Sequence, residues 1–284
     1  MRISIVIPVY NEEQHLAACL EAIARQTVKP FEVLVIDNNS TDDTIKVASA
    51  FTFAKVLKEK RQGVVHARDK GFNSARGEII GRIDADTIIS DEWVATIQKL
   101  FNPNSIEMPI DAVSGAVSYY DLPWSEPVGR LDLTFRQWIA DGLGRDVFLY
   151  GSNMAVRRSA WLKARKQVCH TKGLHEDFDL AIHLAANDFH VAFDRRLQAA
   201  VSLRRFHVTF KDYFLYAWLN PKTYRHHGRF ALQRMYAVIA VVLSAYLLIK
   251  LIYRAYDPVT GKISLIALLT PKNGWRVNPA TFVD

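Results

Sequence analysis

Residues 3–12 read ISIVIPVYNE and set the architecture of the chain. Residues 3–7 are a short, continuous apolar run rich in β-branched side chains, which is typical of a buried parallel strand. The spacing of apolar residues over 12–26 predicts a helix, and residues 32–36 predict a second buried strand. A strand, a helix and a strand in this order indicate a β-α-β unit and hence a parallel sheet.

The alternation of strands and helices continues beyond this unit. The sequence predicts helices over 64–76, 91–101 and 175–187, and strands over 78–83, 112–120, 151–156 and 190–193. The fold class is therefore α/β, with a mainly parallel sheet covered by helices on both faces.

Composition and charge narrow the class of protein. Of the 284 residues, 50% are apolar and 23% are charged, which excludes global disorder, collagen-like repeats and a polytopic membrane protein. The net charge of +7 favours a phosphate-rich ligand or an anionic membrane surface. The two cysteines, Cys19 and Cys169, are too few and too far apart for a disulfide framework or a zinc cluster, so we expect a reducing compartment. Residues 1–8 show no secretory signal.

The sequence predicts three regions, 1–107, 108–210 and 211–284. The first boundary is expected because prolines break the regular alternation after residue 103. The second is expected because aromatic residues mix with cations after residue 210. Such mixtures suit a membrane interface. Residues 235–253 form an apolar run of 19 residues interrupted only by Lys250. As a helix this run measures about 28 Å, against a hydrocarbon core of about 30 Å. It could just span a membrane or, alternatively, form a buried helix of a soluble enzyme, and basic residues on both sides leave its orientation open.

Polar side chains follow three of the predicted strands at the points where the strands end. They are Tyr10-Asn11-Glu12, Asp37-Asn38-Asn39 and Asp84-Ala85-Asp86. Because ligands of open parallel sheets bind beyond the carboxyl ends of the strands, we expect these side chains to meet in one crevice. Alternate residues of an extended segment point the same way, so Asp84 and Asp86 would share a face and attract a hard divalent ion, magnesium or manganese. Neither a Gly-x-Gly-x-x-Gly nor a Walker-type loop is present in the sequence.

Three further groups are candidates for chemistry, each with a structural alternative. Arg68 could face a diphosphate or be a solvated helix residue. The acids of His175-Glu176-Asp177 could complement a helix dipole, or one of them could act as a general base on a hydroxyl acceptor. Asp179 lies roughly 200° around the same helix and cannot share that face. His207 is either structural or a metal ligand.

Six motifs in this order and spacing resemble family 2 glycosyltransferases of GT-A fold over about residues 1–210. They are VIPVYNE (6–12), VIDNNSTD (35–42), Gly63 with Ala67-Arg68, ARGE (75–78), DAD (84–86) and Glu176-Asp177. The resemblance implies a Rossmann-like GT-A domain with a nucleotide-sugar-binding half (1–107) and an acceptor-binding half (108–210), followed by a membrane-associated helical region (211–284). It also implies an inverting transferase that uses a nucleotide-diphosphate sugar and a divalent metal ion, Mn²⁺ or Mg²⁺.

The resemblance assigns roles to individual positions. The residues expected at the donor are Pro8, Tyr10, Glu12, Asp37, Asn39, Arg68, Asp84 and Ala85. The residues expected at the acceptor are Gly151, Ser152, Asn153 and Glu176. Asp177 matches the catalytic base, Asp86 matches the metal ligand, and His207 is an additional metal ligand. The sequence lacks the Gln-x-x-Arg-Trp motif of processive synthases, so we expect transfer of a single sugar.

The leading hypothesis is a transferase that acts on a hydroxyl or phosphate of a lipid-linked acceptor in the synthesis of a cell-envelope glycan. It would lie at the cytoplasmic face of the cell membrane, peripheral or anchored by one C-terminal helix, with no role for nucleic acid. The alternatives are transfer to a soluble glycan or protein acceptor, and a non-catalytic nucleotide-sugar-binding subunit. A nucleotidyltransferase is more remote, because its glycine-rich, lysine-containing phosphate loop is missing.

Overall fold

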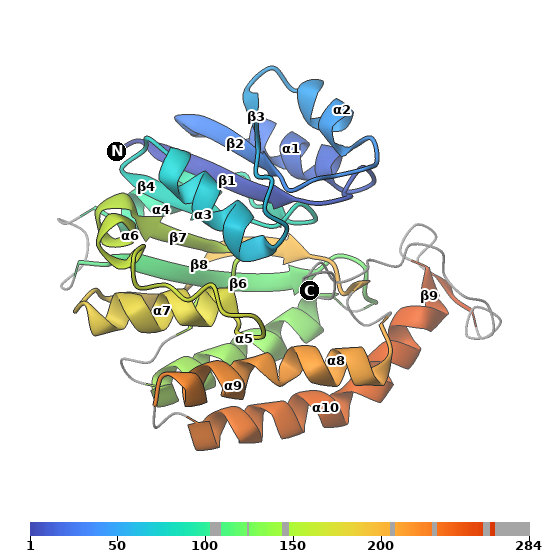
Figure 1. Ribbon diagram of the computed structural model, residues 1–284. Helices are drawn as coiled ribbons and strands as arrows, with labels where there is room; N and C mark the ends of the chain where they lie inside the picture. The colour runs from blue at the N-terminus through green and yellow to red at the C-terminus, as the bar shows by residue number, and fades with distance from the viewer. Residues whose placement is uncertain are drawn as a thin grey trace.

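The computed structural model describes residues 1–102, 109–123, 125–143, 148–204, 208–228, 232–257 and 262–264. Its centre is an eight-stranded sheet with the order β3-β2-β1-β4-β7-β6-β8-β5 (Figure 1). The strands are β1 (Ile3–Val9), β2 (Glu32–Asp37), β3 (Ala54–Lys58), β4 (Ile79–Arg82), β5 (Ile88–Ile89), β6 (Ala112–Tyr119), β7 (Met154–Arg157) and β8 (Val191–Val201). The first four strands are parallel, whereas β7 runs antiparallel to β4 and β6. The predicted α/β class, with a mainly parallel sheet flanked by helices, is confirmed, and the antiparallel pairings make the sheet a mixed one.

Helices flank the sheet on both faces. They are α1 (Leu16–Ala24), α2 (Thr44–Ser49), α3 (Val64–Ser74), α4 (Trp93–Leu100), α5 (Ser125–Leu143), α6 (Arg158–Ala164), α7 (Glu176–Ala186), α8 (Phe210–Ala217), α9 (Leu219–His226) and α10 (Leu232–Ala255). A small antiparallel pair, β9 (Tyr256–Asp257) and β10 (Lys262–Ile263), follows α10.

Alternation along β1 explains why both faces are covered. Ile5 and Ile7 are buried in a core that includes residues of α1 and α4, while Val6 is buried in a second core with residues of α3, α6 and α7. Successive side chains of a strand point to opposite faces, so a strand that is buried at nearly every position needs helices on both sides. Every residue of β1 except Pro8 is buried.

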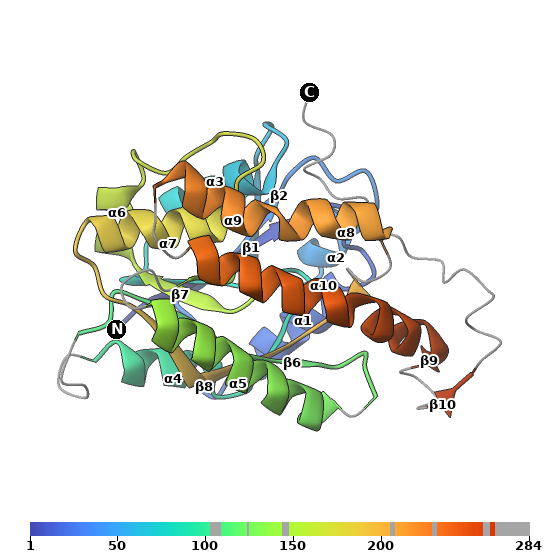
Figure 2. The ribbon, with the colours of Figure 1, turned by 90° about the horizontal axis from the view of Figure 1, so that it is seen from below.

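The helices α5, α8, α9 and α10 form a further layer on the α7 side of the sheet (Figures 1 and 2). Ile139, Phe178, Tyr224 and Val238 join α5, α7, α9 and α10 in one buried apolar cluster. Helix α10 includes the apolar run 235–253. Among the described residues, none of the helices combines the length and apolar character required to cross a membrane. Lys250 of α10 donates to the carbonyl oxygen of Val208 at 2.7 Å and to the hydroxyl of Tyr246 at 2.9 Å.

The later strands differ from the prediction. The strand expected over 151–156 begins at Met154, and β8 extends to Val201 instead of ending near residue 193. Residues 198–201 of β8 pair with β6, and two of them also pair with β5, a two-residue strand that was not predicted. These partners are distant in sequence, so local periodicity gives no sign of them. The predicted boundary near residue 107 lies outside the described residues, but strands from both of its sides share the one sheet.

Candidate functional site

A pocket opens at the carboxyl ends of β1, β2 and β4, with one wall supplied by the N-terminal half of α3. Its lining residues are Pro8, Val9, Tyr10, Asn38, Val64, Ala67, Asp84 and Ala85. The structure therefore brings three strand ends together, as expected for neighbouring parallel strands. Four of the residues predicted at the donor, Pro8, Tyr10, Asp84 and Ala85, line this pocket.

Asp37 and its neighbours take different positions at the end of β2. Asp37 is buried, and its Oδ1 accepts the backbone N–H of Ser40 at 3.0 Å. Asn39 has a positive φ of 66° and donates to the carbonyl oxygen of Lys60 at 2.9 Å, so its side chain is used outside the pocket lining. Asn38 lines the pocket instead, and its Oδ1 accepts the N–H of Gly63, the residue before α3, at 2.7 Å. Nδ2 of Asn38 donates to the carbonyl oxygens of Glu59 and Arg61, so this side chain holds the loop before α3, and the predicted donor contact of Asn39 stays a prediction.

Arg68 lies behind the pocket wall. Its side chain is fully buried and donates to Asp69 Oδ1 from Nε at 3.0 Å and from Nη2 at 2.8 Å. Its Nη1 donates to the carbonyl oxygen of Glu176 at 2.7 Å. In this structure Arg68 therefore connects α3 to the first turn of α7, and it is absent from the described pocket lining where a diphosphate contact was predicted.

Arg82, the last residue of β4, joins the acids of the strand end to those of α7. Its Nη1 forms an ion pair with Asp177 Oδ1, while its Nη2 lies 3.2 Å from Glu176 Oε1 and 3.4 Å from Asp84 Oδ1. The Arg82 side chain is 2% exposed, so these charges attract one another with little water between them. The predicted base, Asp177, is thus held at the same sheet edge as the pocket.

Gly151 completes the environment of Asp177. Its backbone N–H donates to Asp177 Oδ2 at 2.7 Å, so both carboxylate oxygens of Asp177 are oriented by donors. A Cβ at position 151 would lie 2.2 Å from the Arg82 guanidinium carbon. Only glycine permits this approach, and the predicted acceptor residue Gly151 therefore also has a positioning role.

Charge and burial move the pKa values of this cluster in different directions. Burial raises the pKa of Asp177, and the adjacent Glu176 carboxylate adds to this effect against the opposing charge of Arg82. Although burial acts against it, the positive charges of His175, Arg82 and Arg68 lower the pKa of Glu176 to about 2. A carboxyl with a raised pKa is a stronger proton acceptor once ionised, which is the property required of a general base.

Arg204 forms a second ion-pair group at the same edge. Its Nη1 and Nη2 donate to the two carboxylate oxygens of Glu12 at 2.8 and 2.9 Å, and its Nε lies 2.8 Å from Asp86 Oδ2. The bidentate geometry is the strong form of an arginine–carboxylate pair. The predicted donor residue Glu12 and the predicted metal ligand Asp86 are therefore linked through one guanidinium group.

The acceptor residues predicted before β7 divide into two kinds. Asn153 is fully buried, its Nδ2 donates to the carbonyl oxygens of Ala116 and Leu197, and its Oδ1 accepts from the Trp93 indole. With both amide hydrogens used inside the sheet, the Asn153 side chain has a structural role, and its predicted contact with an acceptor stays a prediction. Ser152 is half-buried in the turn that precedes β7.

The residues present fit a hard divalent cation. Among the described groups that form these ion pairs, five carboxylates (Glu12, Asp84, Asp86, Glu176 and Asp177) surround two guanidinium groups. Carboxylate oxygens are the donors that Mg²⁺ and Mn²⁺ prefer. The candidate ligands at the end of β4 are Asp84 and Asp86. His207, the other predicted ligand, lies outside the described residues.

Sequence reasoning missed the part that Arg82 plays. Its signal was an arginine inside the predicted buried strand 78–83, where unbroken apolar character is expected. A charge in such a strand must find partners, because an unpaired buried charge is very costly. The partners themselves, 94 and 95 residues away, were not visible in the sequence.

Comparison with known proteins identifies the family of the chain. The family model described as "Glycosyl transferase family 2" matches residues 4–161. A curated relative, glycosyltransferase GlyG from Streptococcus pneumoniae serotype 4, is 32% identical over 124 residues, covering 42% of this chain and 40% of the relative. The chain therefore matches less than half the length of this curated relative.

Solved structures share the fold at low sequence identity. Mannosyltransferase PcManGT from Pyrobaculum calidifontis, in complex with GDP-Man and Mn²⁺, aligns with a TM-score of 0.65 and 18% identity over 94% of this chain and 77% of its own. Glucosyl-3-phosphoglycerate synthase from Mycobacterium tuberculosis, in complex with Mn²⁺, UDP-glucose and phosphoglyceric acid, aligns with a TM-score of 0.53 and 21% identity over 80% of each chain. At these identities the alignments establish the common fold.

Proposed function

Because the chain belongs to glycosyl transferase family 2, we propose that it is an inverting glycosyltransferase that moves one sugar from a nucleotide-diphosphate sugar to a hydroxyl or phosphate of a lipid-linked acceptor. The observation that carries this proposal is the position of Asp177, held by Arg82 and by the N–H of Gly151 at the edge where the pocket opens. A donor in the pocket and a base beside it are the two elements that the reaction needs.

The pocket supports a role in donor binding. Pro8 and Tyr10 provide apolar and aromatic surface for a nucleoside. The amide of Asn38 supports the pocket from behind, because its Nδ2 donates to the carbonyl oxygens of Glu59 and Arg61 and its Oδ1 accepts the N–H of Gly63. Asp84 is 34% exposed at its side chain and lies between the pocket and the Asp177 cluster, in contact with Arg82. A nucleotide in this pocket would thus have its diphosphate directed toward the acids and arginines of the sheet edge.

The proposed reaction is a single displacement at the anomeric carbon. Asp177 takes the proton of the acceptor hydroxyl while the hydroxyl oxygen forms a bond to that carbon from the face opposite the leaving group. The bond between the anomeric carbon and the diphosphate breaks with its electron pair on the diphosphate, so configuration inverts. Arg82 keeps the Asp177 carboxylate oriented before the acceptor arrives.

A divalent ion would be held by Asp84 and Asp86. When bound there, it would stabilise the negative charge that develops on the departing diphosphate. Arg204 occupies Asp86 Oδ2 in this structure, so Arg204 would move or share that carboxylate when the ion binds.

The helical layer supports a membrane-associated acceptor. Of the 15 large apolar side chains exposed among the described residues, nine lie on this layer, and Figure 2 shows its helices side by side. They are Leu131 and Trp138 on α5, Phe210 and Leu215 on α8, Trp218 after α8, and Tyr236, Val241, Leu247 and Leu251 on α10. Exposed apolar surface combined with a net charge of +7 suits the headgroup region of an anionic bilayer. We place the enzyme at the cytoplasmic face of the cell membrane.

The activity is tested by a screen of nucleotide sugars for sugar release that depends on Mn²⁺ or Mg²⁺, followed by transfer to extracted cell lipids. Release and transfer of a single sugar with inverted configuration is the expected result. Transfer to soluble glycans or proteins alone would contradict the lipid-linked acceptor. Donor binding without release or transfer would identify a non-catalytic subunit and contradict the enzyme.

Membrane association has its own test. Replacing Leu247 and Leu251 by glutamate should reduce co-sedimentation of the full chain with anionic phospholipid vesicles. Leu162→Glu is the matched control, because Leu162 is exposed on α6, away from the helical layer. Equal sedimentation of both variants would show that this layer does not bind the bilayer.

A further inference from the structure

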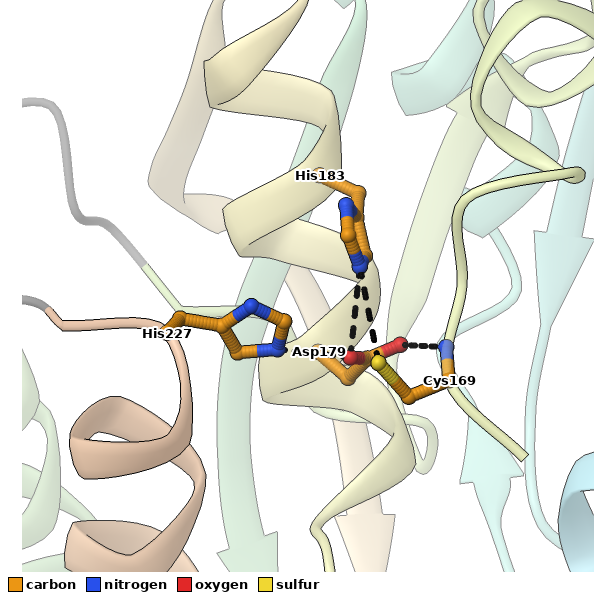
Figure 3. Close-up of side chains that lie close together, drawn as sticks. All are labelled: Cys169, Asp179, His183 and His227. Carbon is orange, nitrogen blue, oxygen red and sulfur yellow. Dashed lines mark hydrogen bonds and ion pairs between the residues drawn. The ribbon is translucent and has the colours of Figure 1, made fainter. Parts of the chain in front are cut away.

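Four side chains with metal-binding chemistry meet on the side of α7 that the proposed reaction does not use (Figure 3). Asp179 and His183 lie one turn apart on α7, Cys169 lies in the segment between α6 and α7, and His227 directly follows α9. Three segments of the chain thus bring their ligand atoms together, although His227 and Asp179 are 48 residues apart in sequence. Figure 3 shows the four side chains pointing toward one another.

The distances between these atoms are close to those of a tetrahedral zinc site. With zinc bonds of about 2.0 to 2.1 Å to nitrogen or oxygen and about 2.3 Å to sulfur, neighbouring ligand atoms lie about 3.3 to 3.6 Å apart. Here Cys169 Sγ lies 3.8 Å from His183 Nε2, Asp179 Oδ1 lies 3.5 Å from the same nitrogen, and His227 Nε2 lies 2.8 Å from Asp179 Oδ1. All four ligand atoms lie within 4.8 Å of one another. Shifts of under about 1 Å would therefore accommodate the ion.

The surroundings of Asp179 hold its carboxylate in the orientation that a metal ligand needs. Its side chain is 1% exposed, and those of His183 and His227 are 16% and 12% exposed. The Oδ2 atom of Asp179 accepts the backbone N–H of Cys169 at 2.9 Å, which leaves Oδ1 directed at the two histidines. Hydrogen bonds of this kind fix the orientation of metal-binding carboxylates.

We propose that Cys169, Asp179, His183 and His227 bind one zinc ion. The Cys169 thiol would release its proton to solvent and bind as the thiolate. A sulfur and two imidazole ligands favour zinc over magnesium or manganese, which prefer oxygen, so this site differs in kind from the acids at the end of β4. Four protein ligands close the coordination shell, which marks a structural site.

The zinc ion would tie the C-terminal helices to the helix that carries the catalytic base. Helix α7 begins with Glu176 and Asp177, and through Asp179 and His183 the ion would join its first two turns to the end of α9. The hydroxyl of Thr223 in α9 already accepts the N–H of His175 at 2.8 Å. Because His175 directly precedes α7, this hydrogen bond links α9 to the start of α7. The zinc would complete this attachment.

Metal analysis and Co²⁺ substitution test the proposal on the full chain. After removal of metals with a chelator and addition of ZnSO₄, we expect one zinc per chain to survive desalting. Cys169→Ser and His227→Gln should each lower zinc affinity at least about 10- to 100-fold. With Co²⁺, the unsubstituted chain should show thiolate-to-cobalt charge transfer and the visible bands of tetrahedral cobalt, and Cys169→Ser should lose the charge transfer.

Matched controls separate this site from the rest of the molecule. Cys19→Ala removes the other cysteine of the sequence and should keep the charge-transfer band, and His190→Gln removes a histidine outside the cluster. Asp86→Asn should keep zinc bound, which separates this test from the ion proposed for catalysis. Circular dichroism of each variant reports folding, and His183→Gln replaces any ligand variant that fails to fold.

Two results would overturn the proposal. One is a folded, unsubstituted chain that retains no zinc and gives no cobalt–thiolate band. The other is zinc binding of unchanged affinity in both Cys169→Ser and His227→Gln. Neither result would bear on the transferase activity, which is measured separately.

Discussion

Asp177 and Asp179 lie two residues apart on α7 and belong to two different regions of the molecule. Asp177 faces Arg82 and the strand ends, whereas Asp179 faces His183, His227 and Cys169. Two residues correspond to roughly 200° of helix rotation, so neighbouring acids point in nearly opposite directions. One aspartate therefore belongs to the anionic, oxygen-rich edge of the sheet, and the other belongs to a cluster of nitrogen and sulfur ligands on the opposite side of α7.

The two regions also shift the carboxyl pKa in opposite directions. Burial raises the pKa of Asp177. Burial also opposes ionisation of Asp179, but hydrogen bonds from His183, Cys169 and His227 outweigh it and lower the pKa to about 2. Partners, rather than depth, thus determine which acid is suited to accept a proton and which is suited to stay ionised.

The largest effect is expected from removing the base. Asp177→Asn should lower kcat for transfer by about 100- to 10,000-fold, because general-base catalysis contributes that much. In the unsubstituted enzyme kcat should fall as pH decreases, because protonated Asp177 cannot accept a proton. Asp179→Asn is the comparison. It should lower the melting temperature of the protein, whereas its kcat should change much less than that of Asp177→Asn. Near-normal transfer by purified Asp177→Asn would refute the assignment.

Removing the buried cation should cost stability. Arg82→Met leaves Asp177, Glu176 and Asp84 without their shared partner and should lower the free energy of unfolding by about 3 to 5 kcal/mol. Arg196→Met is the control, because Arg196 is 64% exposed in its pair with Asp194 and such pairs contribute about 1 kcal/mol or less. Urea titration of both variants measures the difference. Equal losses of unfolding free energy would show that the buried Arg82 pairs stabilise the fold no more than the exposed Arg196 pair.

Acid should destabilise the two regions differently. The pKa of Asp179 falls from 3.8 to about 2 on folding, so its ionised form stabilises the fold above about pH 4, by about 1 to 2 kcal/mol, and this contribution is lost as pH falls toward 2. Asp177 has a raised pKa, so its protonation at low pH removes no such contribution. In urea titrations of the chelator-treated protein from pH 5 to 2, Asp179→Asn should reduce the loss of stability. An unchanged profile, matching that of Asp141→Asn on the exposed side of α5, would contradict this account.

The smallest effect concerns competition at Asp86. Arg204→Gln removes the cation that lies 2.8 Å from Asp86 and should lower the apparent dissociation constant for Mn²⁺ by at least about fivefold, since a charge at about 4 Å is worth about 1 kcal/mol in water and more where water is excluded. Isothermal titration with Mn²⁺ measures the change, with Arg196→Gln as the control. Weaker Mn²⁺ binding would show that Arg204 supports the ion instead of competing with it.

Much of the sheet and its polar edge could be predicted from sequence. Apolar runs identify β1, β2 and β4, and the polar residues that follow them do meet at one edge. Helical periodicity also predicted that Asp179 faces away from Asp177, which the structure confirms. Asn39, predicted at the donor, is absent from the lining of the described pocket and donates to Lys60, so its contact with a donor stays a prediction.

The partners of the charged groups could not be predicted in this way. Counting cysteines argued against a zinc cluster, yet the fold places Cys169 beside His183, with Asp179 and His227 completing the group. Arg82 and Arg204 find their acids 95 and 192 residues away.

The sequence by itself determined the β-α-β order, the residues at the strand ends and the direction of each side chain on its own element. These follow from backbone periodicities that repeat every 2 or about 3.6 residues and need no distant partner. Only the tertiary structure decided which cation faces which acid, because those contacts arise when strands and helices far apart in the chain pack together and exclude water. The pairing of Asp177 with Arg82 and the contact of His227 with Asp179 exist only in the folded protein.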